Sequence, residues 1–245
     1  YNYPNPLRIG LAGGIATPES TAAAFAMGAA FVLTGSINQA CREAGTSETV
    51  RRMLTKAEQA DVAMAPAADM FEMGVKVQVL KRGTMFSMRG SKLYDIYRTY
   101  DRFEEVPANE RKVVEGSFLR CTFEQEWEKT QAYFRQRDPA QIDRARKDPK
   151  HKMALVFRSY LGRASLWAQK GVPDRTIDYQ IWCGPAMGAF NAWVAGSFLA
   201  TLRAYVQIAE RPCVLLGPID DGGPDVAGAT CIPALPRGAV NRGRS

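Results

Sequence analysis

The 245-residue sequence has few of the side chains that build metal centres and disulfide frameworks. It contains one histidine, and its five cysteines form no CxxC pair. Because the number of cysteines is odd and their spacing is wide, we expect reduced thiols in a cytoplasmic protein. One histidine with scattered cysteines offers no metal-ligand spacing, so we predict no metal site.

Long apolar runs and targeting signals are also missing. No apolar run reaches the roughly 18 residues of a membrane-spanning helix, so no membrane span is expected. No signal peptide opens the sequence. No G-x-S-x-G elbow or cysteine–histidine context indicates a nucleophile, and we see no internal repeat. The chain begins at Tyr1 and a predicted strand follows almost at once, so we expect a piece of a longer protein.

The composition is that of a folded protein with a basic balance. Apolar residues make up 46% of the chain and aromatic residues 10%, which excludes a disordered chain. The formal net charge is +7, and the pI is near 9.2. This charge favours an acidic partner or an anionic ligand, although on a chain of this length the signal is weak.

Residues 7–39 predict a strand, a helix, a second strand and a new helix start. Leu7, Ile9 and Leu11 leave little room for a polar face, which is typical of a buried parallel strand. Thr17 and Pro18 are an N-cap and a first-turn proline. Residues 31–33 read as the next buried strand. Ser36 has the spacing of a capping box with Gln39, so we expect a helix to begin there.

Each of these strands ends at a glycine turn, Gly13-Gly14 and Gly35-Ser36. Parallel neighbours bring both turns to one edge, where backbone amides could face an anion and Ser36 could add a hydroxyl donor. In an α/β barrel the last two such loops form a phosphate site. The spacing alone is equally compatible with ordinary strand-to-helix turns. A Rossmann interpretation is weaker, because the glycines do not form GxGxxG.

The rest of the chain reads as mainly helical. Pro66 is taken as a helix start, and Asp138-Pro139 and Asp148-Pro149 as caps followed by proline. Cys183-Gly184-Pro185 followed by Gly188 indicates either a close backbone approach or a simple helix start. Further segments are a helix over about 47–59, a strand through 75–79, and helices around 86–97, 123–134 and 150–167.

Three groups of side chains allow more than one interpretation. His151 lies in a basic run, which favours a solvated helix start over a catalytic role. The basic residues are either a solvated face over an aromatic core or a surface for an acidic carrier, a dinucleotide phosphate or nucleic acid. The methionines predict adaptable packing, or the lining of an acyl tunnel. The basic group is Lys76, Lys81, Arg82, Arg89 and Lys92, and the methionine group is Met64, Met70, Met73, Met85 and Met88.

Several segments together resemble one family. AGGIATPESTAAAFAMGAAFVLTGSINQ resembles the last two βα units of FMN-dependent barrels of the nitronate monooxygenase and enoyl-reductase type. The continuation TKAEQADVAMAPAADMFEMGVKVQVLKRGTMFSMRGSKLYDIYRTYDRFEEVP, then DPKHKMALVFRSYLG and DYQIWCGPAMGAFNAWVAGSF, resembles the C-terminal half of the PfaD-type family. Those proteins act as enoyl reductases beside polyunsaturated fatty acid and polyketide synthases. The resemblance spans about residues 7–210.

The resemblance implies an α/β fold: the C-terminal fragment of a TIM (β/α)8 barrel followed by a mainly helical extension. The flavin phosphate would rest on Gly13, Gly14, Gly35 and Ser36. NADPH would reduce the FMN, and the flavin would pass a hydride to an enoyl thioester on an acyl carrier protein. The domains expected are 1–60 for the final βα units and 61–210 for the helical region. For 211–245 we expect a disordered tail, because the composition shifts to glycine, proline, aspartate and alanine from about Gly217.

The sequence departs from the family at both ends. About six βα units that precede this point in the family, with most of the flavin ring site and the catalytic pocket, are not in the sequence. The tail after about Glu210 also differs. We therefore expect the chain alone to be inactive and identify no catalytic residue. Alternatives are a nitronate monooxygenase-like flavoprotein and a non-catalytic module that binds a carrier or synthase domain. No motif supports nucleic-acid binding.

Overall fold

The structure is a computed structural model that describes residue 3 and residues 7–196. It is a mixed α/β structure, mostly helical, with few strands. The predicted tail over 211–245 and the last part of the predicted helical region lie outside the described residues. Strands and α-helices in chain order are β1 (Gly10–Ala12), α1 (Pro18–Ala26), β2 (Phe31–Leu33), α2 (Glu48–Leu54), β3 (Val62–Pro66), β4 (Lys76–Leu80), α3 (Phe86–Thr99), α4 (Ala108–Val113), α5 (Phe123–Arg137), α6 (Ala140–Lys147), α7 (Pro149–Lys170) and α8 (Ala186–Ala195).

Tighter or wider helical turns connect these elements. The 3₁₀ turns are η1 (Ser36–Ala40), η2 (Arg42–Ala44), η3 (Gln59–Asp61), η4 (Phe71–Met73), η5 (Phe103–Glu105) and η7 (Pro173–Asp178), and η6 (Val114–Leu119) is a π-helix. None of the helices among the described residues has the length and apolar character needed to cross a membrane.

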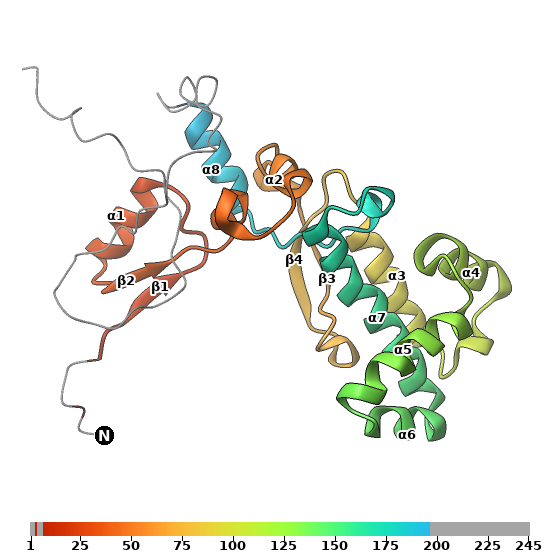
Figure 1. The fold of residues 1–245 in the computed structure, drawn as a ribbon. Helices are drawn as coiled ribbons and strands as arrows, with labels where there is room; N and C mark the ends of the chain where they lie inside the picture. Colours follow the sequence, from red (N-terminus) through yellow and green to blue (C-terminus); the bar gives the residue numbers. More distant parts are fainter. Residues whose placement is uncertain (1–2, 4–6, 197–245) are drawn as a thin grey trace, which may run out of the picture.

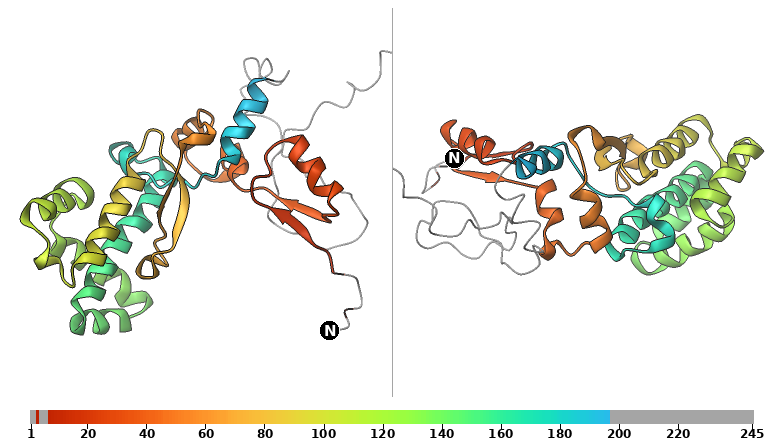
Figure 2. Two further views of the ribbon diagram at one scale, coloured as in Figure 1. Left: turned by 180° about the vertical axis from the view of Figure 1, so that it is seen from behind. Right: turned by 90° about the horizontal axis from the view of Figure 1, so that it is seen from above.

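The first unit is the predicted parallel strand pair with its helix. β1 pairs with β2 in parallel, with Gly10 opposite Phe31 and Ala12 opposite Leu33. Thr17 is the N-cap of α1, as predicted from the sequence, and it forms a capping box with Ser20. Figures 1 and 2 show this unit at one end of the molecule, with α8 between it and the helical body.

The predicted burial of this strand pair is wrong in the structure. Leu7 and Ile9 are each 72% exposed, and Phe31 and Leu33 are also exposed. The physical reason is that α1 is the helix that packs on β2, while β1 and β2 pair only with each other among the described residues. An apolar face of two parallel strands is left without a covering layer.

The second sheet is an antiparallel hairpin, β3–β4, with Ala63 opposite Val79 and Pro66 opposite Lys76. Pro66 is the last residue of β3, so its interpretation as a helix start is wrong. A proline is tolerated at the end of an edge strand because no ladder bond needs its amide. The predicted strand over 75–79 is confirmed as β4.

Helix α7 organises the main core. Asp148 caps it by accepting a 3.0 Å hydrogen bond from the His151 amide, and Gly171 ends it in the left-handed conformation, with φ 66°. It packs against α3, α5 and α6 around Phe71, Phe86 and Phe157. A second cluster joins α2, β4 and α8 around Leu54, Leu80 and Met187.

Candidate functional site

The two glycine turns leave the carboxyl ends of adjacent parallel strands. β1 ends at Ala12, which is opposite Leu33 at the end of β2, so both turns lie at the same edge of the pair. Gly13 and Gly14 have φ values of 84° and 73°. Residues with a side chain rarely adopt these positive φ values, which explains why two consecutive glycines occur there. Gly35, at φ −116°, needs no such freedom.

Open space surrounds these glycines. A Cβ built on Gly13, Gly14 or Gly35 would meet no atom within 4 Å. Among the described residues, none of these three amides, nor that of Ser36, donates to a backbone carbonyl. Unpaired amides with clear access are what an anion needs from a backbone. The local geometry therefore fits a phosphate group.

The helix predicted to begin at Ser36 is wrong. Residues 36–40 form the short 3₁₀ turn η1, and no side chain caps it. The expected capping box is absent because the Ser36 hydroxyl oxygen accepts a 2.8 Å bond from the Gly184 amide. The side chain of Asn38 makes the local hydrogen bond instead, since its amide group donates to the Thr34 carbonyl at 2.8 Å. Ser36 keeps its hydroxyl hydrogen, so it can still donate to an anion.

Gly184 brings a distant segment to the second turn. The segment before it pairs with the hairpin: the Leu80 amide donates to the Ile181 carbonyl at 2.8 Å, and the Cys183 amide donates to the Gln78 carbonyl at 3.3 Å. A Cβ on Gly184 would lie 2.9 Å from Gln78 Oε1 and 3.2 Å from Ser36 Oγ. Ser36, Gly184 and Gln78 therefore form one polar group beside the turn.

Both interpretations of Cys183-Gly184-Pro185 are confirmed. Helix α8 begins at Ala186, directly after the proline. Gly188 makes the close approach, because a Cβ there would overlap the backbone nitrogen of Gln59. Burial raises the pKa of the Cys183 thiol to about 11, so this thiol is not an activated nucleophile. Cys41, Cys121 and Cys183 are free thiols, as expected.

Sequence reasoning missed Gln78. Nothing near residue 78 indicates a site, because its position follows from pairing between β4 and the segment 181–183 about a hundred residues later. Its cross-strand partner is Met64, whose side chain is exposed. The packing interpretation of the methionines is wrong for Met64, Met73, Met85 and Met88, all of which are exposed.

The basic residues divide into two groups. Arg82 pairs with Asp61 and, at 2.7 Å, with Glu58. Lys92 pairs with Glu110 at 2.6 Å. Arg89 contacts the buried Asp178. Lys76 and Lys81 are exposed. Most of this charge is therefore used within the fold, which weakens the interpretation of the set as a carrier surface.

His151 is not a solvated helix start, so that prediction is wrong. Its side chain is buried, with Nδ1 3.1 Å from Glu72 Oε1 and Nε2 2.8 Å from Gln141 Oε1. Burial, followed by the charge of Arg144, lowers the pKa of His151, and Glu72 opposes this shift. It lies in the helical body near η4 and α6 and does not contact the glycine turns. No group of three metal-capable side chains occurs within the described ranges.

Comparisons with known proteins agree with part of the resemblance. Residues 100–179 match the family described as acyl-carrier-protein S-malonyltransferase, inserted helical domain. The chain is 48% identical over 217 residues to one of the polyunsaturated fatty acid synthase subunits of Thraustochytrium sp., covering 87% of this chain and 14% of the relative. It is 45% identical over 203 residues to the polyketide biosynthesis protein PksE of Bacillus subtilis, covering 83% of this chain and 26% of that protein.

A solved structure is also similar. The enoyl reductase domain of MlnA, from the macrolactin biosynthesis cluster of Bacillus amyloliquefaciens, superimposes with a TM-score of 0.75 at 43% identity. The match covers 80% of this chain and 44% of that one. The chain thus spans a small part of the curated relatives it matches and less than half of the solved domain. Its homologues are synthase subunits and polyketide biosynthesis proteins, and its structural neighbour is an enoyl reductase domain.

Proposed function

We propose that the chain is the C-terminal part of an FMN-dependent, trans-acting enoyl reductase of polyunsaturated fatty acid or polyketide biosynthesis. The observation that carries this proposal is the pair of open glycine turns at one edge of a parallel strand pair. The similarity to the enoyl reductase domain of MlnA supports the reaction class. In this proposal the reductant is NADPH and the substrate is an enoyl thioester on an acyl carrier protein.

The strand pair is proposed to belong to a (β/α)8 barrel completed by other βα units. The exposed apolar side chains of β2 and of the segment just before β1 support this proposal, because such a face is stable only when further strands and helices cover it. The remaining part of the solved enoyl reductase domain, which this chain does not match, is long enough to hold those units.

The residues of both turns have defined roles in the proposal. The amides of Gly13, Gly14 and Gly35 donate to the phosphate of FMN, and Ser36 adds its hydroxyl. The Gly184 amide holds the Ser36 oxygen so that its hydrogen can point toward the anion. When bound, FMN supplies the hydride chemistry, and the protein holds and orients it.

A chimera tests the proposed activity. Residues 7–196 replace the matching part of the MlnA enoyl reductase domain, and the purified chimera is assayed with NADPH and an enoyl thioester. The expected result is a bound flavin spectrum and NADPH-dependent reduction of the double bond. Oxidation of a nitronate with oxygen, without enoyl reduction, would favour the nitronate monooxygenase alternative. A folded chimera without flavin contradicts the proposal.

A further inference from the structure

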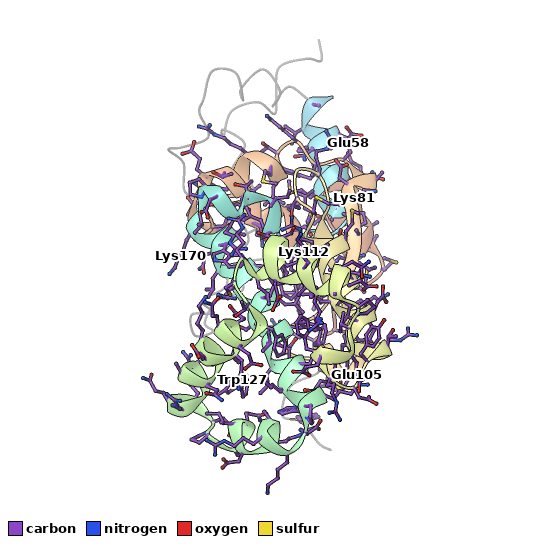
Figure 3. All side chains as sticks on the ribbon, turned by 90° about the vertical axis from the view of Figure 1, so that its right-hand side faces the viewer. Glu58, Lys81, Glu105, Lys112, Trp127 and Lys170 are labelled. Atoms are coloured by element: carbon purple, nitrogen blue, oxygen red, sulfur yellow. The ribbon has the colours of Figure 1, made fainter. Side chains whose placement is uncertain are left out.

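A surface hollow lies in the helical body, away from the glycine turns. It is open to solvent, has a volume of about 360 Å³ and is lined by Ala108, Arg111, Lys112, Glu115 and Gly116, from α4 and the π-helix η6. Figure 3 labels Lys112 on α4, and Figure 1 shows α4 at the end of the molecule opposite β1 and β2. Its volume falls within the range of about 300–1,000 Å³ that is usual for small-molecule sites.

Arg111 is the side chain that makes this hollow unusual. It is half-buried, and its Nε atom is buried without a hydrogen-bond partner. The Nε of Arg89 is buried without a partner as well, but every half-buried arginine other than Arg111 among the described residues is paired through a terminal nitrogen: Arg51 donates to the Thr46 carbonyl, and Arg89, Arg158, Arg163 and Arg175 pair with carboxylates. A buried N–H donor without a partner costs free energy, and no described carboxylate pairs with the rest of the Arg111 guanidinium, so this side chain indicates a ligand that the protein itself does not supply.

The acidic groups nearby do not neutralise it. Glu110 is paired with Lys92 at 2.6 Å. Glu115 lines the hollow, but its Oε1 accepts a 2.7 Å bond from the Phe123 amide at the start of α5. Neither carboxylate forms an ion pair with Arg111 or Lys112 in the described structure. The lining therefore carries two cations against one engaged carboxylate, which favours an anion.

The shape of the hollow indicates an anion with an organic part. Ala108 and Gly116 are its small residues, and a Cβ on Gly116 would meet no atom within 4 Å. The space left beside the two cations is larger than a phosphate group alone needs. The segment η6 is a π-helical turn. Such turns are rare in proteins, and those that occur are often found at functional sites.

We propose that the hollow between α4 and η6 binds the phosphate group of an organic phosphate ester, with Arg111 and Lys112 as its cationic contacts. Arg111 suits a phosphate because its planar fork can donate two parallel bonds, and Lys112 adds a point charge. Two sources, a phosphopantetheine arm and the 2′-phosphate of a nicotinamide dinucleotide, follow from the proposed function. The site itself does not depend on that function.

The test uses the full 245-residue chain and three probes: inorganic phosphate, phosphopantetheine and adenosine 2′-monophosphate. Binding is followed by amide chemical shifts in NMR and by calorimetry. We expect one ester to bind more tightly than inorganic phosphate and to shift the amides of residues 108–116. The ester that binds more tightly identifies the source.

Variants separate this site from surface charge. Arg111→Gln and the exposed Lys112→Gln should each weaken ester binding by about tenfold, since each removes a charge-assisted contact. Gly116→Leu fills the hollow without changing charge and should also weaken it. Arg135→Gln, at an exposed arginine on α5, is the matched control and should bind like the wild type.

Three results would overturn the proposal: no binding of either ester by the wild-type chain, equal binding by the wild type and Arg111→Gln, or inorganic phosphate binding as tightly as both esters. The binding assay does not involve flavin, so such a result would not contradict the proposed flavin site. In the same way, a chimera that binds no flavin would not contradict the proposed phosphate-ester site in the hollow between α4 and η6.

Discussion

The Gly184 amide donates a 2.8 Å hydrogen bond to the hydroxyl oxygen of Ser36, joining positions 148 residues apart in the chain. This bond explains why the second glycine turn is followed by a 3₁₀ turn rather than a capped α-helix. It also connects the hairpin β3–β4 to the first strand pair, because Gln78 lies against the same glycine. The candidate phosphate site is thus supported by the helical body.

Gly184→Ala is expected to weaken flavin binding by the chimera. The added methyl would lie 2.9 Å from Gln78 Oε1 and 3.2 Å from Ser36 Oγ, so the polar group beside the turn must shift. The dissociation constant of FMN, measured by fluorescence quenching, should rise by about tenfold, as expected for the loss of one oriented bond to a charged group. Gly162→Ala is the control, because a Cβ at that position meets open space.

Gly188→Ala is expected to destabilise the fold strongly. The new Cβ would overlap the backbone of Gln59, so helix α8 cannot stay against η3 without a backbone shift. Overpacking of this kind costs typically about 1–3 kcal/mol. Gly162→Ala, inside α7, should instead stabilise by up to about 1 kcal/mol, as is usual for glycine in a helix. Urea unfolding of both variants measures the difference, and equal midpoints would contradict the packing described for Gly188.

Asp178→Asn is expected to be far more damaging than the loss of a surface carboxylate. Asp178 is fully buried; it accepts a 2.7 Å bond from the Tyr160 hydroxyl and contacts Arg89 and Arg175. Removing its charge leaves cations without compensation, which costs about 3–5 kcal/mol in buried pairs. The matched control is Asp143→Asn in the exposed pair with Arg146, expected to cost less than about 1 kcal/mol. Comparable losses of unfolding free energy in the two variants would refute this assignment.

His151 should titrate below the usual histidine range. Its pKa is lowered by burial and by Arg144, while Glu72 opposes the shift. Below about pH 6.5 the unfolded chain takes up a proton that the folded chain resists, so the free energy of unfolding should fall as the pH decreases. Because the chain has one histidine, its ring signals in NMR report this pKa directly. A midpoint above 6.5, or an unchanged pH dependence in His151→Gln, would contradict it.

The starts of several helices could be predicted from the sequence, because capping residues and first-turn prolines next to each helix determine where it begins. Asp148 and Pro149 begin α7, and Thr17 and Pro18 begin α1, because capping needs only residues a few positions apart. Ser47 caps α2 at the expected start, but this helix ends at Leu54 and not near residue 59 as expected. Asp138 departs from this rule, since the N-cap of α6 is Pro139, which makes no side-chain cap bond.

Predictions failed where a distant residue decides the outcome. The Ser36 hydroxyl bonds to Gly184 instead of capping a helix, and the buried ring of His151 faces Glu72, 79 residues earlier. Pro66 belongs to a strand because β4 pairs with it. Leu7 and Ile9 have the apolar pattern of a buried strand, yet no described element covers them. Pairing and burial of this kind are not encoded in a local window.

Comparison of FMN with riboflavin in the chimera tests the central claim most directly. Riboflavin lacks the phosphate, so turns that hold this group must bind FMN more tightly. We predict a preference for FMN of at least about tenfold, reduced in Ser36→Ala because one charge-assisted donor is lost. Equal affinity for FMN and riboflavin, or a preference that Ser36→Ala leaves unchanged, would contradict the assignment of Gly13, Gly14, Gly35 and Ser36 to the flavin phosphate.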